Sequence, residues 1–81
     1  MKRDKENLEF ILEAALKIGR FLGDSDKESF LKDEKTQSSV ILQLIVIGEL
    51  AKKLSEESKN KIDLPWRLIS GFRDLAVHEY F

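Results

Sequence analysis

The sequence predicts an all-α protein folded as an up-and-down helical bundle, and three observations support this prediction. Apolar residues recur at three- and four-residue steps over the first quarter of the chain, which is the period of a helix with one buried face. A second apolar segment, VILQLIVIGEL, is flanked by polar residues that tolerate helix. A third periodic segment follows Pro65 and continues to the end of the chain.

The first helix is predicted from about Asp4 to Leu22, and Gly23 ends it. Its apolar residues form one wide stripe that we expect to be buried: Leu8, Ile11, Leu12, Ala15, Leu16, Ile18, Phe21 and Leu22. Ser25 and Glu28 have the spacing of a capping box. A short second helix is therefore expected here, and it should carry Phe30 and Leu31 into the core.

The third helix is predicted from about Asp33 to Leu54, with a frayed end that extends towards Ser58. It is apolar on nearly every side, so we expect it to be the central helix of the bundle or part of a subunit interface. Its β-branched residues would also suit a buried strand, but no second strand exists to pair with it. Gly48 weakens such a helix by about 1 kcal/mol relative to alanine, which points to close packing at this position.

The fourth helix is predicted to follow the polar loop SEESKNKID, with Pro65 near its first turn. It runs to Phe81 without a C-cap or trailing polar residues. We therefore expect one domain, residues 1–81, that is truncated at its C-terminal end.

Composition limits the classes of function. The chain has 81 residues, no cysteine and one histidine, so disulfides, thiolate metal sites and histidine-rich metal sites are excluded. With 14 basic and 15 acidic residues, a broad basic surface for nucleic acid is not expected, and RNA would have to bind in a local pocket. We expect a soluble, cytoplasmic protein, because neither a targeting signal nor a membrane-spanning segment is visible.

The closing run FRDLAVHEYF contains the residues with the greatest chemical potential. His78 is the only side chain whose ordinary pKa lies near neutrality. Arg73 and His78 lie about 140° apart around a helix, but an arginine side chain is long enough to reach towards the histidine edge. Arg73 and Tyr80 are within about 20° of each other and share a face. Taken alone, these residues are better explained as a helix-terminal cation and core aromatics.

The run resembles the RX4HXY signature of HepT-type toxins in the HEPN superfamily, read as Arg73, His78 and Tyr80. The resemblance continues upstream through LPWRLISGFR, IGELAKKLS, ESFLKDEKTQSSVI and RDKENLEFILEA, so it covers nearly the whole chain. Asp74 departs from the asparagine that many HEPN proteins carry after the arginine. The resemblance also implies a C-terminal helix after the motif, which we expect this chain to lack.

The resemblance implies a HEPN-like helical domain and a metal-independent endoribonuclease that needs no cofactor. In that family the site forms between two protomers, so Arg73 and His78 are the expected catalytic residues of a homodimer that cuts RNA. It also implies a prokaryotic toxin–antitoxin system whose nucleotidyltransferase-fold antitoxin transfers AMP to Tyr80. Asp74 and Glu49 are the expected supporting residues, although Glu49 could simply be a solvated residue on the helix face.

Two alternatives remain open at this point. In the first, the chain is a non-catalytic helical module that binds a nucleotidyltransferase partner or a nucleotide, and Arg73 and His78 hold phosphate without cutting. The near-neutral charge, Asp74 and the abrupt end favour it. In the second, the chain is a purely structural bundle and the motif is a coincidence.

Overall fold

The computed structural model describes residues 2–80, with side chains for residues 3–79. This part of the chain forms five helices and no strand: α1 (Lys2–Leu22), α2 (Lys27–Leu31), α3 (Glu34–Lys52), α4 (Glu56–Lys61) and α5 (Trp66–Tyr80). The all-α class predicted from the sequence is confirmed. Within the same residues, no helix combines the length and the apolar character that crossing a membrane requires.

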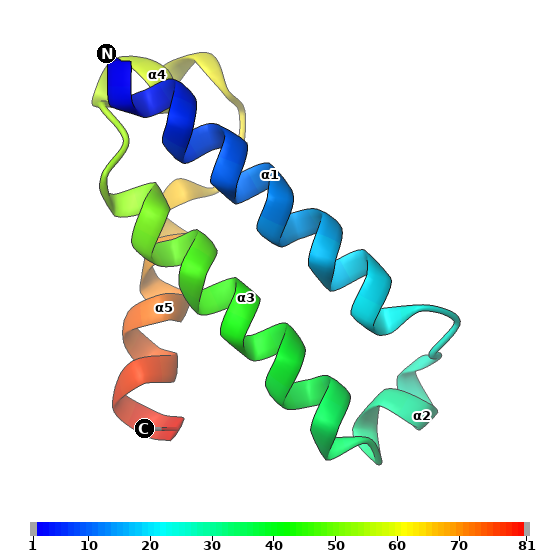
Figure 1. Cartoon of the computed structure of the whole chain (residues 1–81). Coiled ribbons are helices and arrows are strands. Elements are labelled where there is room, and N and C mark those ends of the chain that lie inside the picture. The colour runs from blue at the N-terminus through cyan, green and yellow to red at the C-terminus, as the bar shows by residue number, and fades with distance from the viewer. Residues whose placement is uncertain (1, 81) are drawn as a thin grey trace.

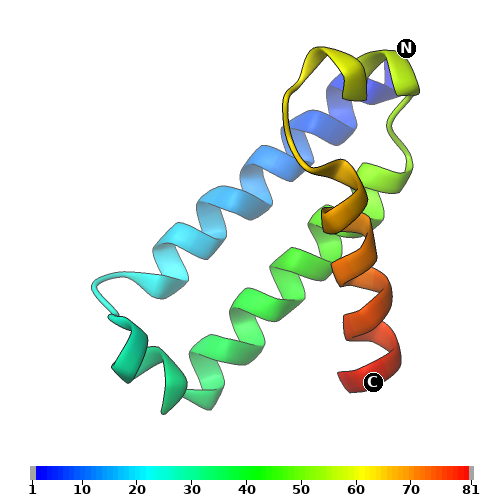
Figure 2. The same ribbon diagram turned by 180° about the vertical axis from the view of Figure 1, so that it is seen from behind.

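Three long helices form the body of the molecule, and α3 lies in the middle. α1 and α3 run antiparallel, side by side, and α5 packs on α3 (Figure 1). The opposite view shows α2 joining α1 to α3 at one end and α4 leading from α3 into α5 at the other (Figure 2). The apolar third helix is thus the central one, the first of the two positions predicted for it.

The buried core consists mostly of small side chains. Its apolar members are Ala14, Val40, Ala51, Leu54 and Ala76. Larger apolar side chains stay exposed on both outer helices, among them Leu12, Leu16, Leu68 and Leu75. The prediction that the whole stripe of the first helix is buried is therefore wrong for its exposed members: Leu12, Ala15, Leu16 and Phe21. The reason is that α3 is the main neighbour of α1 and covers only one side of it.

The predicted capping box at the start of α2 is displaced by one residue. Asp26, and not Ser25, is the N-cap, and its carboxylate accepts a hydrogen bond of 2.8 Å from the backbone N–H of Ser29. Asp26 is as good an N-cap residue as serine, because its side-chain oxygen accepts from an otherwise unpaired helix N–H. Leu31 was expected in the core, but it is 63% exposed.

The segment after α3 differs most from the prediction. α3 ends at Lys52 instead of Leu54, and the expected polar loop contains the separate helix α4. Ser55 is the N-cap of α4, and its Oγ accepts from the backbone N–H of Ser58 at 3.2 Å. Glu56 and Glu57 in the first turn favour a helix start at this position.

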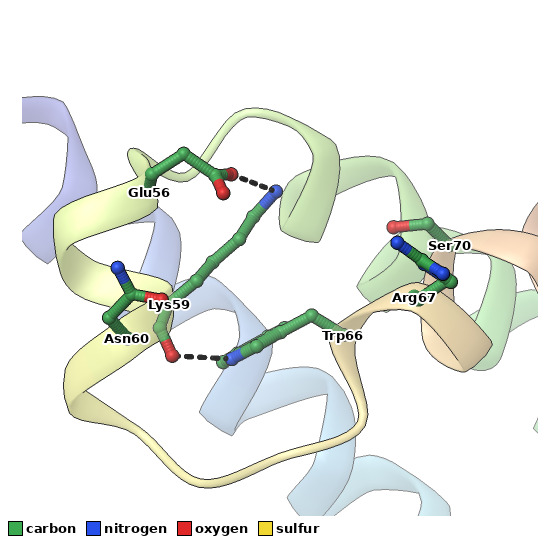
Figure 3. A pocket seen from close by; sticks show the side chains of 6 residues that line it. All are labelled: Glu56, Lys59, Asn60, Trp66, Arg67 and Ser70. Carbon is green, nitrogen blue, oxygen red and sulfur yellow. Dashed lines mark hydrogen bonds and ion pairs between the residues drawn. The ribbon is translucent and has the colours of Figure 1, made fainter.

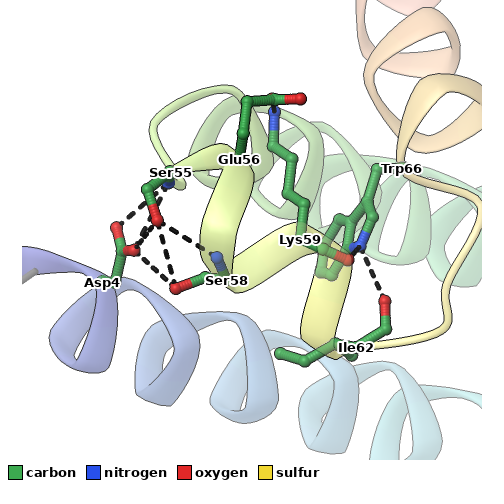
Figure 4. A network of polar contacts seen from close by, with 7 residues as sticks. All are labelled: Asp4, Ser55, Glu56, Ser58, Lys59, Ile62 and Trp66. Atoms are coloured by element: carbon green, nitrogen blue, oxygen red, sulfur yellow. Dashed lines mark hydrogen bonds and ion pairs between the residues drawn. The ribbon is translucent and has the colours of Figure 1, made fainter.

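Helix α4 is anchored on both sides by polar contacts. On one side, the indole Nε1 of Trp66 donates to the carbonyl oxygens of Lys59, at 3.1 Å (Figure 3), and Ile62, at 3.0 Å (Figure 4). On the other side, buried Asp4 of α1 accepts from the hydroxyls of Ser55 and Ser58 and from the backbone N–H of Ser55 (Figure 4). The start of α1 and the start of α5 are therefore both fixed to α4.

The Asp4 contacts predict a pH-dependent stability. Hydrogen bonds from Ser55 and Ser58 lower the pKa of Asp4. A carboxyl whose pKa is lowered on folding stabilises the protein above its unfolded value of about 4, and this stabilisation is lost as the pH falls through the folded value. We expect Asp4→Asn to lower the melting temperature at pH 7, and we expect the difference from wild type to shrink towards pH 3.

Thermal unfolding followed by circular dichroism at both pH values measures this effect. Asp24→Asn is the matched control, because Asp24 is exposed and its side chain makes no hydrogen bond to any residue of the described range 3–79. An Asp4→Asn protein as stable as wild type at pH 7 would contradict the role given to this network.

Candidate active site on helix α5

Helices α3 and α5 approach each other closely at Gly48, and this contact sets the position of Arg73. A Cβ atom on Gly48 would overlap the Cβ of Arg73 and would lie only 3.0 Å from the carbonyl oxygen of Ile69. Gly48 itself is buried. The close packing predicted for this glycine is confirmed, and its partner is the helix that carries the motif.

The Arg73 side chain lies between two carboxylates. Its Nε is 2.7 Å from Glu49 Oε2 on α3, and its Nη1 donates to Asp74 Oδ1 at 3.0 Å. The Nε–H does not point along the line to Glu49, and Nε has no hydrogen-bond acceptor within the described residues. Glu49 therefore attracts the guanidinium electrostatically, and the Nε atom itself is buried between the two helices.

Asp74 joins this group to a second cation, because Lys52 of α3 pairs with the same Oδ1 atom. The hydrogen bond from Lys52, and then that from Arg73, lowers the pKa of Asp74, so its carboxyl stays ionised at neutral pH. The negative charge of Asp74 is thus offset by its two neighbours. Together Glu49, Lys52, Arg73 and Asp74 form a charge cluster with no formal net charge.

His78 lies one helical turn beyond Asp74 and is exposed. Positions four apart are neighbours on a helix surface, so the Arg73–Asp74 hydrogen bond turns the guanidinium towards the side of α5 that carries His78. His78 forms no hydrogen bond or ion pair with any residue of range 3–79. Its ring is therefore open to a ligand, although the structure shows no direct contact between the two expected catalytic side chains.

Tyr80 belongs to α5, and its backbone follows Arg73 by two helical turns. Its side chain, and the whole of Phe81, lie outside the described part of the molecule. The assignment of Tyr80 as an AMP acceptor therefore stays a prediction.

One member of the cluster, Lys52, was missed by reasoning from sequence. The available signal was its spacing three residues after Glu49 on a helix, which places both side chains on one face. Among residues 2–80, no group of three or more histidine, aspartate and glutamate side chains could hold a metal ion.

Comparison with known proteins assigns the chain to a family. The profile of the family described as "Ribonuclease HepT-like" matches residues 11–81. A relative from Methanocaldococcus jannaschii is named as a putative RNase. It is 44% identical across 88% of this chain and 60% of its own length. A relative from Thermococcus cleftensis is named as a probable ribonuclease HepT. It is 41% identical across the full chain and 76% of its own length.

A third relative, from Caldanaerobacter subterraneus, is also named as a putative RNase. It is 40% identical across the full chain and 73% of its own length. The chain thus spans 60% of the first of these relatives and about three quarters of the other two. No solved structure matches it. The profile match over most of the chain and the identities of 40% or more show that this chain belongs to the HepT-like ribonuclease family.

Proposed function

We propose that the protein is the toxin of a prokaryotic toxin–antitoxin system and that it cleaves RNA in the cytoplasm without a metal ion. The observation that carries this proposal is the arrangement on α5. The Arg73 guanidinium is held by Glu49 and Asp74 and turned towards the side of an exposed His78. A fixed cation and an exposed imidazole on the same helix suit cleavage of a phosphodiester, which needs charge stabilisation and proton transfer.

The proposed reaction is attack of a ribose 2′-oxygen on the adjacent phosphorus. The 2′-O–P bond forms, the bond to the 5′-oxygen of the next nucleotide breaks, and a 2′,3′-cyclic phosphate remains. One group accepts the proton of the 2′-hydroxyl and another donates a proton to the leaving 5′-oxygen. The Arg73 side chain is partly exposed, and the positive charge of its guanidinium would offset the charge that develops on the phosphate oxygens during attack.

A single histidine cannot easily accept and donate a proton in the same step, so we propose that two copies of the chain share one site. A two-fold axis brings the same surface together twice and supplies a second His78. An exposed apolar stripe on α5 supports such pairing, because Leu68 is 72% exposed and Leu75 is 59% exposed. These leucines are seven residues apart and therefore aligned, and His78 lies about 60° further around the helix.

Disrupting the stripe is expected to separate the copies and remove activity together. We expect Leu68→Glu and Leu75→Glu to give a monomer of unchanged helix content, because a charged side chain resists burial in an apolar interface. Mass in solution, helix content and RNA cleavage are measured on the same preparations.

Leu31→Glu is the matched control, since Leu31 is 63% exposed but lies on α2. A Leu68→Glu protein that still dimerises and cleaves RNA would contradict the use of this stripe.

We propose that Tyr80 is the residue through which the toxin is silenced. The phenol oxygen of Tyr80 would attack the α-phosphorus of ATP held by a nucleotidyltransferase-fold antitoxin, releasing pyrophosphate and transferring the phenolic proton to solvent. AMP added two residues after His78 would place negative charge and bulk against RNA. Incubation with the antitoxin and ATP should therefore add one AMP to wild type and none to Tyr80→Phe.

The direct test of the nuclease proposal is incubation of the purified protein with end-labelled RNA in EDTA. We expect cleavage that leaves 2′,3′-cyclic phosphate ends in the wild-type reaction and not in a His78→Ala reaction. RNA that is bound but not cut would favour the alternative, a non-catalytic module. Cleavage that EDTA abolishes would contradict metal independence.

A further inference from the structure

A polar hollow of about 380 Å³ lies where α4 leads into α5, apart from the charge cluster around Arg73. Its lining side chains are Glu56, Lys59, Asn60, Trp66, Arg67 and Ser70. Figure 3 shows Trp66 between the α4 residues on one side and Arg67 with Ser70 on the other. We refer to these six residues as the Trp66 pocket. Its volume is within the range of small-molecule sites, which begins at about 300 Å³.

Trp66 presents an aromatic surface in a fixed orientation. Its only polar atom, Nε1, donates to the carbonyl oxygens of Lys59 and Ile62. The ring is half-buried and lines the pocket. Because the N–H is already used, a flat aromatic ligand that packs on the indole in this pocket breaks no hydrogen bond of Trp66.

The charged side chains of the pocket favour an anion. Arg67 is exposed and forms no ion pair within the described residues. Lys59 is paired with Glu56 at 3.6 Å, so Arg67 is the cation in excess. A guanidinium offers a planar fork of donors that matches phosphate. Asn60 adds an amide that can both donate to and accept from a base edge.

The Trp66 pocket and His78 lie along one side of α5. Arg67 precedes Asp74 by seven residues and His78 by eleven. Around the helix axis, Asp74 and His78 therefore each lie within about 20° of Arg67. Eleven residues of helix span about 16 Å. An extended nucleic-acid strand that follows this side would connect the pocket to His78 over a few nucleotides.

We propose that the Trp66 pocket binds one nucleotide of a single-stranded RNA substrate, a few nucleotides from the bond that is cut. The base stacks on Trp66, Arg67 binds its phosphate and Asn60 contacts the base edge. A duplex keeps its bases stacked on each other, so only a single-stranded base can reach the indole. This inference rests on the proposed ribonuclease function and names a substrate contact that the charge cluster does not supply.

The test uses the intrinsic fluorescence of Trp66, the only tryptophan of the chain. The protein carries His78→Ala, so that RNA is not cut, and it is titrated with a short single-stranded oligoadenylate. We expect saturable quenching with a dissociation constant that rises about three- to tenfold in Arg67→Ala, the size expected for one exposed charged contact. Arg20→Ala is the matched control, because Arg20 is exposed in the last turn of α1 and carries the same charge.

Four results would overturn the proposal: no quenching, equal quenching by duplex RNA, stronger binding of free AMP than of the oligonucleotide, or the same weakening in Arg20→Ala as in Arg67→Ala. The two proposals fail separately. Fluorescence quenching without RNA cleavage by the wild type would support binding in the Trp66 pocket and refute the nuclease proposal. RNA cleavage without quenching would refute only the proposal for the Trp66 pocket.

Discussion

Replacing Gly48 with alanine should destabilise the protein, although alanine normally strengthens a helix. The added methyl group would overlap the Cβ of Arg73 and crowd the carbonyl oxygen of Ile69. Neither atom can move away without displacing α5, because both are part of the backbone or directly attached to it. Overpacking of this kind costs about 1–3 kcal/mol, and most of this range lies above the roughly 1 kcal/mol that alanine gains in helix propensity.

Gly19 provides the matched control, because it is an exposed glycine in α1 and a methyl group added to it would have no neighbouring atom within 4 Å. Gly19→Ala should therefore raise the melting temperature while Gly48→Ala lowers it, by about 4–8 °C for each kcal/mol. RNA cleavage should fall in Gly48→Ala and not in Gly19→Ala, since only the first substitution displaces Arg73. Equal effects of the two substitutions on stability would contradict the close approach of α3 and α5.

Removing the imidazole of His78 is expected to have the largest effect on activity. General acid–base groups contribute about a hundredfold to ten-thousandfold in rate, so His78→Ala should lower kcat by this factor. Because His78 is exposed, we expect no change in helix content or melting temperature. Glu79→Ala, the neighbouring exposed side chain, is the matched control and should retain cleavage.

Arg73 should behave differently from His78. Arg73→Lys keeps the charge but loses the planar fork of donors, so we expect part of the activity to remain, whereas Arg73→Ala removes both. Mixing wild-type and His78→Ala chains adds a test of the shared site. If both copies must supply the histidine, activity falls as the square of the wild-type fraction, and a linear fall would refute the shared site.

The helices could be predicted from the sequence because they depend on local periodicity. The three long helices follow from apolar residues at helical spacing, and their observed ends lie within a few residues of the predicted ones. Helix α4 was missed because six residues are too few to show a period. Its start depends instead on Ser55, whose role as N-cap is a matter of a single side chain.

Burial could not be predicted to the same extent. Spacing shows that one face of α1 is apolar, but it does not show how much of that face a neighbour covers. Leu12 and Leu16 are exposed because α3 contacts the other part of the stripe. Helical period alone cannot distinguish a stripe that is covered within the chain from one that is left for a partner.

The candidate site, too, could be predicted from the sequence only in part. The residue types and spacing of Arg73, Asp74 and His78 are visible in the sequence as one segment of helix. Lys52 and Glu49 reach Arg73 and Asp74 only because α3 packs on α5, and no pattern along the chain encodes that contact. The bond between Asp4 and Ser55 joins residues 51 positions apart, and it depends equally on tertiary packing.

The contact at Gly48 also has a consequence for how this protein can evolve. A side chain at position 48 would meet a Cβ and a backbone carbonyl, which are present whatever the residue types at positions 73 and 69, glycine at 73 excepted. A compensating substitution on α5 is therefore not available while position 73 keeps its arginine. Position 48 should consequently stay glycine in every descendant that keeps Arg73, which makes the glycine as useful as the arginine and the histidine for recognising distant sequences with this site.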